Sequence, residues 1–199
     1  MKRVTEKKER ALGVKLFLKP ERCNSPKCVM IRRPYRPGVH GMKRKGPISD
    51  YGRQLKEKQK IQITYGLSNR QMQNLFKEPL ERILLTLEKR LDRVVFLSGF
   101  APSPRVARQI VSHGHIHVNG RKVTIPSYHV RVGDIIAIRP ESRGSKLFEA
   151  LGEKLKSYEP PTWLELDKVG LKAKCVANPK TNEINLAFDA NLVGQFYSR

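Results

Sequence analysis

Seven apolar residues between positions 80 and 95 recur at steps of three and four, the spacing that places side chains on one face of an α-helix. They are Leu80, Ile83, Leu84, Leu87, Leu91, Val94 and Val95. Gly99 follows this stripe, so we expect a single helix from about Leu80 to Gly99. An apolar face of this width has to be buried, which requires a folded core although only 39% of the residues are hydrophobic.

Capping residues predict two helices before the apolar stripe. Asp50 is expected to be the N-cap of a helix that continues to about Tyr65, where Gly66 ends it. Ser68 opens the next helix, and Gln71, three residues later, completes a capping-box pattern. The chain before and within the stripe is therefore helical.

A short helix and several strands are predicted after the stripe. Ser103 suits an N-cap and Pro104 the first turn of a helix that reaches about His113, before Gly114. Alternating apolar residues predict short strands at Ile116 and Val118, at Val123 and Ile125, at Ile136 and Ile138, and at Trp163–Leu166. Asn119-Gly120 and Gly133-Asp134 predict turns, the first in a tight hairpin. A terminal helix is expected around Leu192, Val193, Phe196 and Tyr197.

Residues 1–48 have a different composition. Five prolines and four glycines interrupt this segment, with Lys and Arg between them, so we expect a basic and largely irregular arm that becomes ordered on a partner. The whole chain is expected to be α+β. Its helical domain comprises residues 49–89 and 180–199. Residues 90–179 form an inserted second domain with a helix-turn-helix-hairpin module at about 90–152.

The net charge of +22 is uneven along the chain. Residues 1–60 contain 19 Lys and Arg against five Asp and Glu, a net of +14. Such an excess predicts a polyanionic partner. A membrane is not expected, because the Pro- and Gly-rich arm cannot form an amphipathic helix and no apolar run reaches the roughly 18–20 residues of a membrane span. No secretory signal is recognised at the N-terminus, and three cysteines indicate a reducing compartment.

One face of the helix over 104–113 carries the candidate chemistry. Arg105, Arg108 and Ser112 share that face, with Gln109 beside them. Guanidinium, amide and hydroxyl donors suit the backbone of double-stranded or junction RNA, whereas few aromatic residues are present for stacking on single strands. The alternative is a solvated basic helix without a ligand.

Several motifs of the module resemble one known family. They are Arg90-Leu91-Asp92-Arg93-Val94-Val95, Gly99-Phe100-Ala101, the run from Ala107 to Gly120, Ile125-Pro126-Ser127-Tyr128 and Gly133-Asp134. The arm adds Glu21-Arg22-Cys23, Ser25-Pro26-Lys27-Cys28, Arg32-Arg33-Pro34-Tyr35 and Pro37-Gly38, and further matches occur at Ser49-Asp50-Tyr51, Tyr65-Gly66 and Phe196-Tyr197-Ser198-Arg199. Almost the whole chain resembles the S-four family of bacterial-type small-subunit ribosomal proteins.

This resemblance implies a structural component of the small ribosomal subunit. Such proteins bind small-subunit rRNA directly, nucleate assembly of its 5′ region and contact the neighbouring protein S-five, which supports translational accuracy. Some also line the path of the incoming mRNA. The chain is accordingly expected in the ribosome of the cytoplasm, an organelle ribosome being the alternative, and not as an autonomous homo-oligomer.

The resemblance carries RNA contact, as a class, to the basic and polar positions that match. In the arm and the helical domain these are Lys19, Arg22, Lys27, Arg32, Arg33, Arg36, His40, Lys43, Arg44, Arg53 and Lys58. In the module they are Arg105, Arg108, Gln109, Ser112, His113, His115, Asn119, Arg121 and Lys122.

The chain departs from the family at two places. Many members have a Cys-x-x-Cys pair that completes a four-cysteine zinc site, whereas here Glu6-Lys7-Lys8-Glu9 occupies that stretch and only Cys23 and Cys28 remain. Because closed zinc sites need four ligands and prefer Cys and His, no metal and no cofactor are expected. Pro104 stands where an arginine is frequent, so one phosphate contact is expected to be lost.

Two other functions are alternatives to a ribosomal role. The same module occurs in pseudouridine synthases and tyrosyl-tRNA synthetases, but the rest of this chain has no phosphate loop or nucleophile–base pair, so no enzymatic activity is expected. A free-standing RNA chaperone would not need the long arm or the C-terminal segment.

Overall fold

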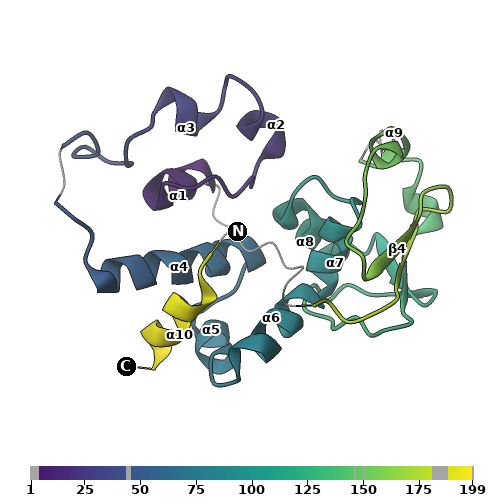
Figure 1. The fold of residues 1–199 in the computed structure, drawn as a ribbon. Helices are drawn as coiled ribbons and strands as arrows, with labels where there is room; N and C mark the ends of the chain where they lie inside the picture. The colour runs from purple at the N-terminus through teal and green to yellow at the C-terminus, as the bar shows by residue number, and fades with distance from the viewer. Residues whose placement is uncertain (1–4, 44–45, 146, 150, 181–187, 199) are drawn as a thin grey trace. The chain divides into compact units, whose positions relative to one another are not determined.

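The computed structural model describes residues 5–43, 46–145, 147–149, 151–180 and 188–198 (Figure 1). The chain separates into two compact units, Met1–Leu80 with Leu186–Arg199 and Glu81–Asn185. We refer to them as unit 1 and unit 2 and describe each by itself. The predicted boundaries after residues 48, 89 and 179 remain predictions.

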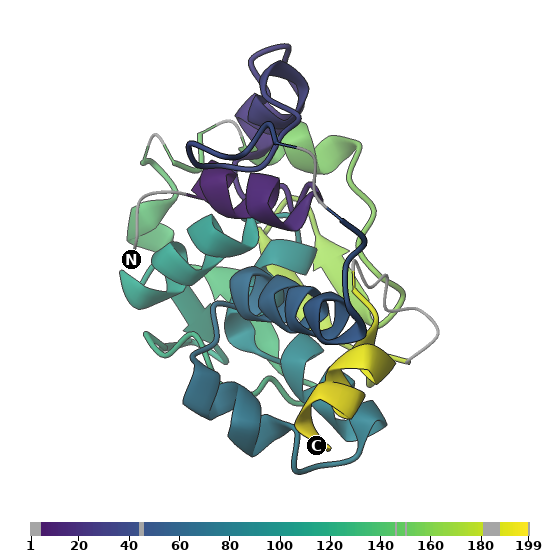
Figure 2. The same cartoon turned by 90° about the vertical axis from the view of Figure 1, so that its left-hand side faces the viewer.

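The regular secondary structure in the described residues of unit 1 is entirely helical, with loops between the helices. It contains α1 (Thr5–Leu12), α2 (Pro20–Cys23), α3 (Val29–Arg32), α4 (Asp50–Tyr65), α5 (Asn69–Leu75) and α10 (Ala190–Tyr197). Helix α10 lies against α4, where the Phe196 and Tyr51 rings are 5.6 Å apart and Phe76 stacks on Tyr197 at 5.0 Å (Figures 1 and 2). Residues far apart in sequence thus form one helical unit.

The helix caps of unit 1 explain where α4 and α5 begin. Ser68 and Gln71 form the predicted capping box at the start of α5. The N-cap of α4 is Ser49 and not Asp50, because the Ser49 backbone is extended and its Oγ accepts the Gly52 N–H at 3.2 Å. Gly66 ends α4 in the left-handed conformation, at φ 62°, as expected.

Three segments of the largely irregular arm are helical, which was not predicted. Helices α1, α2 and α3 all lie within residues 1–48, and Leu12, Leu16 and Leu18 form a small buried cluster. Ile63 of α4 packs against that cluster, so the arm is attached to the body of unit 1 by apolar burial. The cluster was not predicted, because its three leucines lie in one short stretch of a segment whose composition is otherwise dominated by Pro, Gly, Lys and Arg.

The prediction of a single helix over the apolar stripe is wrong. The stripe is divided between α6 (Leu80–Glu88) and α7 (Leu91–Leu97). At the break, the backbone bonds to the loop around Tyr128 instead of continuing the helical hydrogen bonds. The Leu91 N–H donates to the Tyr128 carbonyl at 2.8 Å, and the Val130 N–H donates to the Lys89 carbonyl at 2.9 Å. Six of the seven stripe residues are buried and Leu80 is half-buried, so the periodicity persists across the break.

The remainder of unit 2 combines helices with a small sheet. Helix α8 (Pro104–Ser112) packs on α7, and the described strands form a five-stranded antiparallel sheet in the order β2-β1-β3-β5-β4. These strands are β1 (Ile116–Val118), β2 (Arg121–Lys122), β3 (Ile135–Ile138), β4 (Leu164–Asp167) and β5 (Lys172–Cys175). A short 3-10 helix, η1 (Pro140–Ser142), and α9 (Leu151–Lys156) complete the unit. The mixture of helices and antiparallel sheet confirms the α+β class.

The hairpin differs from its prediction in one detail. Asn119 and Gly120 have φ values of 51° and 77°, as a two-residue primed turn requires. This tight turn pairs Val118 directly with Arg121, so the second strand is Arg121–Lys122 and not the predicted Val123 and Ile125.

Candidate nucleic-acid interface

Helix α8 presents a polar face above a fully buried one. Its start is fixed by Ser103, which is buried and whose Oγ accepts the Val106 N–H at 3.3 Å. Ala107, Ile110 and Val111 are buried in the core of unit 2, which determines the rotation of the helix. The opposite side bears half-buried Arg105 and Arg108 with exposed Gln109 and Ser112, as predicted from their spacing.

A buried carboxylate holds two arginines beside this helix. Both oxygens of Asp92 accept from Arg90, at 3.0 Å to Nε and 2.8 Å to Nη2. Arg108 Nη1 lies 3.8 Å from the same carboxylate. Asp92 is therefore a positioning residue for Arg108 and not a candidate catalytic group, because its charge is already satisfied by two guanidinium groups.

The β1–β2 hairpin brings further cations close to the end of α8. A Cβ on Gly114, which has φ 77°, would lie 2.2 Å from Lys122 Cε, so the Lys122 side chain covers the end of the helix. His113, which follows α8 directly, and Arg121, which precedes Lys122, are both exposed. Together with the polar face of α8, these residues form what we call the module surface: Arg105, Arg108, Gln109, Ser112, His113, Arg121 and Lys122.

Two predicted contacts of the module already have structural partners. The Asn119 amide donates to Asp134 Oδ1 at 2.8 Å and accepts the Ile135 N–H at 2.9 Å, which holds the hairpin against β3. His115 Nδ1 lies 2.9 Å from Ser142 Oγ, and its ring meets Phe148 edge-on. These side chains support the hairpin, which leaves them less able to bind RNA directly.

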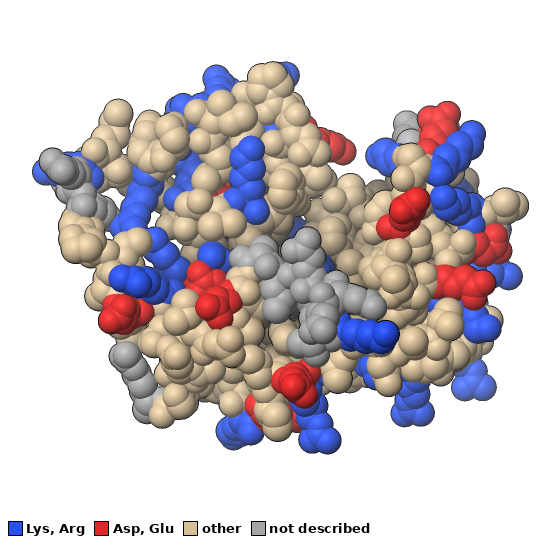
Figure 3. Space-filling model, viewed as in Figure 1, with Lys and Arg blue, Asp and Glu red and all other residues tan. Residues whose placement is uncertain are grey.

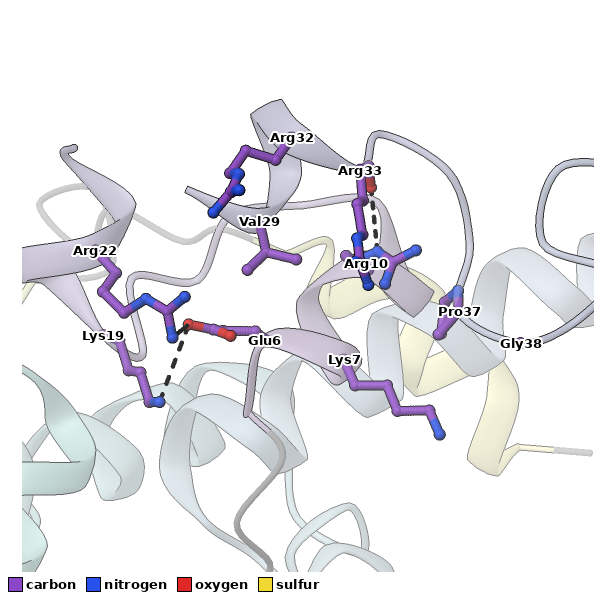
Figure 4. A pocket seen from close by; sticks show the side chains of 10 residues that line it. All are labelled: Glu6, Lys7, Arg10, Lys19, Arg22, Val29, Arg32, Arg33, Pro37 and Gly38. Atoms are coloured by element: carbon purple, nitrogen blue, oxygen red, sulfur yellow. Dashed lines mark hydrogen bonds and ion pairs between the residues drawn. The ribbon is translucent and has the colours of Figure 1, made fainter. Parts of the chain in front are cut away.

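The arm encloses a strongly cationic pocket of about 650 Å³ (Figure 4). Its described lining includes six cationic side chains and one carboxylate: Lys7, Arg10, Lys19, Arg22, Arg32, Arg33 and Glu6. Glu6 Oε1 forms ion pairs with Arg22 Nη1 at 2.8 Å and with Lys19 Nζ at 4.0 Å, so it gathers two cations on one side of the pocket. The excess of positive charge around the pocket would attract an anion.

Arg10 closes the other side of the pocket and was missing from the predicted contacts. Its guanidinium donates to the carbonyls of Arg33, Tyr35 and Arg36 and stacks over the Tyr35 ring. Lys7 was missed as well. Their i, i+3 spacing on one helical face would have pointed to both, but the arm was not expected to contain a helix.

The other predicted residues of unit 1 are dispersed. Exposed positions include Lys27, His40, Lys43 and Arg53, and Arg36 is half-buried. Lys58 lies over the Phe196 and Tyr197 rings, at 4.5 and 5.1 Å from their centres, so its charge also stabilises the contact between α4 and α10. Arg44 is outside the described residues. On the face in Figure 3, Lys and Arg side chains are prominent around the N-terminal arm.

The residues at the family's zinc position do not fit a metal. Glu9 is buried and one of its oxygens accepts the N–H groups of Leu16 and Leu18, at 3.0 and 3.2 Å, while Glu6 is paired with Arg22. Burial, and secondarily the Glu9 carboxylate, raises the pKa of the Cys23 thiol, which disfavours the thiolate that a metal would need. Within the described residues, no group of three or more His, Cys, Asp or Glu could hold a metal ion.

No helix in the described part of the chain is long and apolar enough to cross a membrane.

Comparison with known proteins agrees with this geometry. Residues 1–94 match the family described as Ribosomal protein S4/S9 N-terminal domain, and residues 89–136 match the S4 domain. The small ribosomal subunit protein uS4 of Thermus thermophilus is 50% identical over 194 residues, covering 94% of this chain and 93% of that protein. The proteins of the same name from Syntrophomonas wolfei and Clostridioides difficile are each 43% identical over the same share. The chain belongs to the uS4 family of small ribosomal subunit proteins.

Proposed function

We propose that this chain binds small-subunit rRNA directly through two surfaces, the pocket of the arm and the module surface. The pocket supports this most strongly, because six cations around one carboxylate have no use in a free protein comparable to the binding of a polyanion. The family is a structural, non-enzymatic component of the ribosome, and RNA binding is the physical form that such a role takes.

The module surface suits the backbone of folded RNA. Arg105 and Arg108 can approach phosphates as planar forks, and Gln109 and Ser112 donate hydrogen bonds to phosphates or 2′-hydroxyls. Because α8 is rotationally fixed by its buried side, these donors are aimed before RNA arrives. A pre-aimed surface loses little freedom on binding and favours early, direct association.

We further propose the finer roles that the family resemblance implies. The chain nucleates assembly of the 5′ region of the rRNA, contacts protein S-five and thereby supports translational accuracy, and lies close to the incoming mRNA. We place it in the cytoplasmic ribosome.

Binding of the full chain to a transcript of the rRNA 5′ region, measured at several salt concentrations, tests the central proposal. Arg105→Ala and Arg32→Ala should each weaken binding and reduce the salt slope by about one. Arg108→Ala should have a smaller effect, since Asp92 already shares its charge. The control is Lys154→Ala, an exposed cation of α9 outside both surfaces.

Two outcomes would contradict the proposal. One is equal affinity and equal salt slope for all four variants and the unaltered chain. The other is sedimentation of the protein in the soluble pool of a lysate, away from small subunits, which would favour a free RNA chaperone. Co-purification with protein S-five tests the protein contact separately.

A further inference from the structure

A strained aromatic residue projects from the arm. Phe17 has φ 51°, a left-handed conformation that bulky side chains rarely adopt, and its side chain is 48% exposed. Both neighbours are buried, Leu16 at 8% and Leu18 at 5% exposure. A large apolar ring is therefore held in water at a cost in backbone strain, which calls for a reason outside the free protein.

The strain is imposed by a buried carboxylate. One oxygen of Glu9, itself 2% exposed, accepts the N–H of Leu16 at 3.0 Å and that of Leu18 at 3.2 Å. The backbone is thus held on both sides of Phe17, and the leucines on either side point into the cluster that contains Leu12. With both neighbours turned inward, the Phe17 side chain is directed out.

The surroundings of Phe17 favour a polyanion over a protein. Lys15 and Lys19 lie two residues away on either side and are exposed. Lys19 also lines the cationic pocket, and its Cα is within roughly 7 Å of that of Phe17 along the chain. A ring beside a phosphate-binding pocket matches the base and the phosphate of one stretch of single-stranded RNA.

We propose that Phe17 is a stacking platform for an unpaired base of small-subunit rRNA whose backbone phosphates occupy the adjacent pocket. The inference rests on the proposed rRNA binding and adds a single-stranded contact to it. It departs from the expectation, drawn from the small number of aromatic residues, that stacking on single strands is less favoured than contact with the backbone of folded RNA.

Three variants of the full chain, with a transcript of the rRNA 5′ region as the probe, test this inference. Phe17→Ala should weaken binding by about 5- to 150-fold, the range for loss of one base–aromatic stack, and Phe17→Leu should weaken it similarly. Phe17→Trp should retain the original affinity. The salt slope should be unchanged in all three, since no charge is removed.

A fluorescence signal distinguishes stacking from general burial. Trp163, the single tryptophan of the sequence, is only 4% exposed, so its emission should respond little to RNA and serves as the control. Emission from Phe17→Trp should be quenched when RNA is added. Absence of quenching would overturn the inference.

Other outcomes also decide it. Full affinity in Phe17→Leu would indicate an apolar contact with a protein or with the RNA backbone and would exclude stacking. Phe17→Gly should leave the amide protection of Leu16 and Leu18 unchanged or increased, because it relieves the strained φ. Reduced protection would assign Phe17 a structural role and reject the platform.

If the unaltered chain fails to bind the transcript, the proposed function fails; if it binds and Phe17→Ala binds equally well, only this inference fails.

Discussion

The pocket of the arm and the module surface are both cationic, but they are kept in shape by different forces. In unit 2, a continuous core of buried apolar residues from α7, α8 and the sheet fixes the module surface. In the arm, the described apolar cluster is small, with Leu12, Leu16 and Leu18 as its buried members, and polar contacts of Glu6, Glu9 and Arg10 also hold the segments together. The comparison shows that one chain can present RNA-binding charge on a rigid surface and on a lightly held one.

The two carboxylates that gather arginines give the sharpest test of this difference. Asp92→Ala should lower the free energy of unfolding of unit 2 by about 3–5 kcal/mol, because it leaves Arg90 buried without its charge partner. Glu6→Ala should lower stability by about 1 kcal/mol or less, since Arg22 remains in contact with water. Thermal and denaturant unfolding measure both. Equal losses would mean that the arm is as firmly held as the module.

Glu9 tests whether the arm unfolds locally. Glu9→Ala removes two hydrogen bonds to a charged acceptor and should lower the local stability of the arm by about 1.5–3 kcal/mol. Hydrogen exchange at the Leu16 and Leu18 amides should accelerate, while amides of β1 and β3 stay protected and serve as the internal control. Faster exchange in both units would show that they unfold together.

Removal of zinc should have the smallest effect on stability. A chelator should leave the melting temperature of the purified protein unchanged, because Glu6 and Glu9 are committed to internal partners and the Cys23 thiol favours its protonated form. Elemental analysis provides the direct check. One zinc atom per chain would contradict this expectation and would make the arm a metal-stabilised element.

Sequence patterns predicted the elements that depend on local signals. The capping box at Ser68, the end of α4 at Gly66, the extent of α8 and the turn at Asn119-Gly120 were all expected from short motifs. The class of the fold and the polar face of α8 followed from periodicity. These features need no knowledge of distant partners.

The remaining features depend on contacts between distant residues. The break between α6 and α7 requires the loop around Tyr128, which periodicity over 80–95 cannot reveal. Strand β5 reads as Lys-Ala-Lys-Cys, whose small and charged residues give little strand signal until Ala173 and Cys175 are buried against the sheet. The organising role of Arg10 depends on hydrogen bonds from its guanidinium to the carbonyls of Tyr35 and Arg36, which lie far from it in sequence. Phe17 stands out only through its backbone conformation.

The pairing of α10 with α4 has a consequence for the order of synthesis. Helix α4 needs α10 to cover it: Gln54 donates to Gln195, Phe196 meets Tyr51, and the Asp189 N–H donates to Glu57. All described residues of unit 2 lie between these two helices in the chain. A growing polypeptide therefore begins unit 1 first and completes it last. Until residues 190–197 leave the translating ribosome, the nascent chain can hold a finished unit 2 while the face of α4 that contacts α10 remains uncovered.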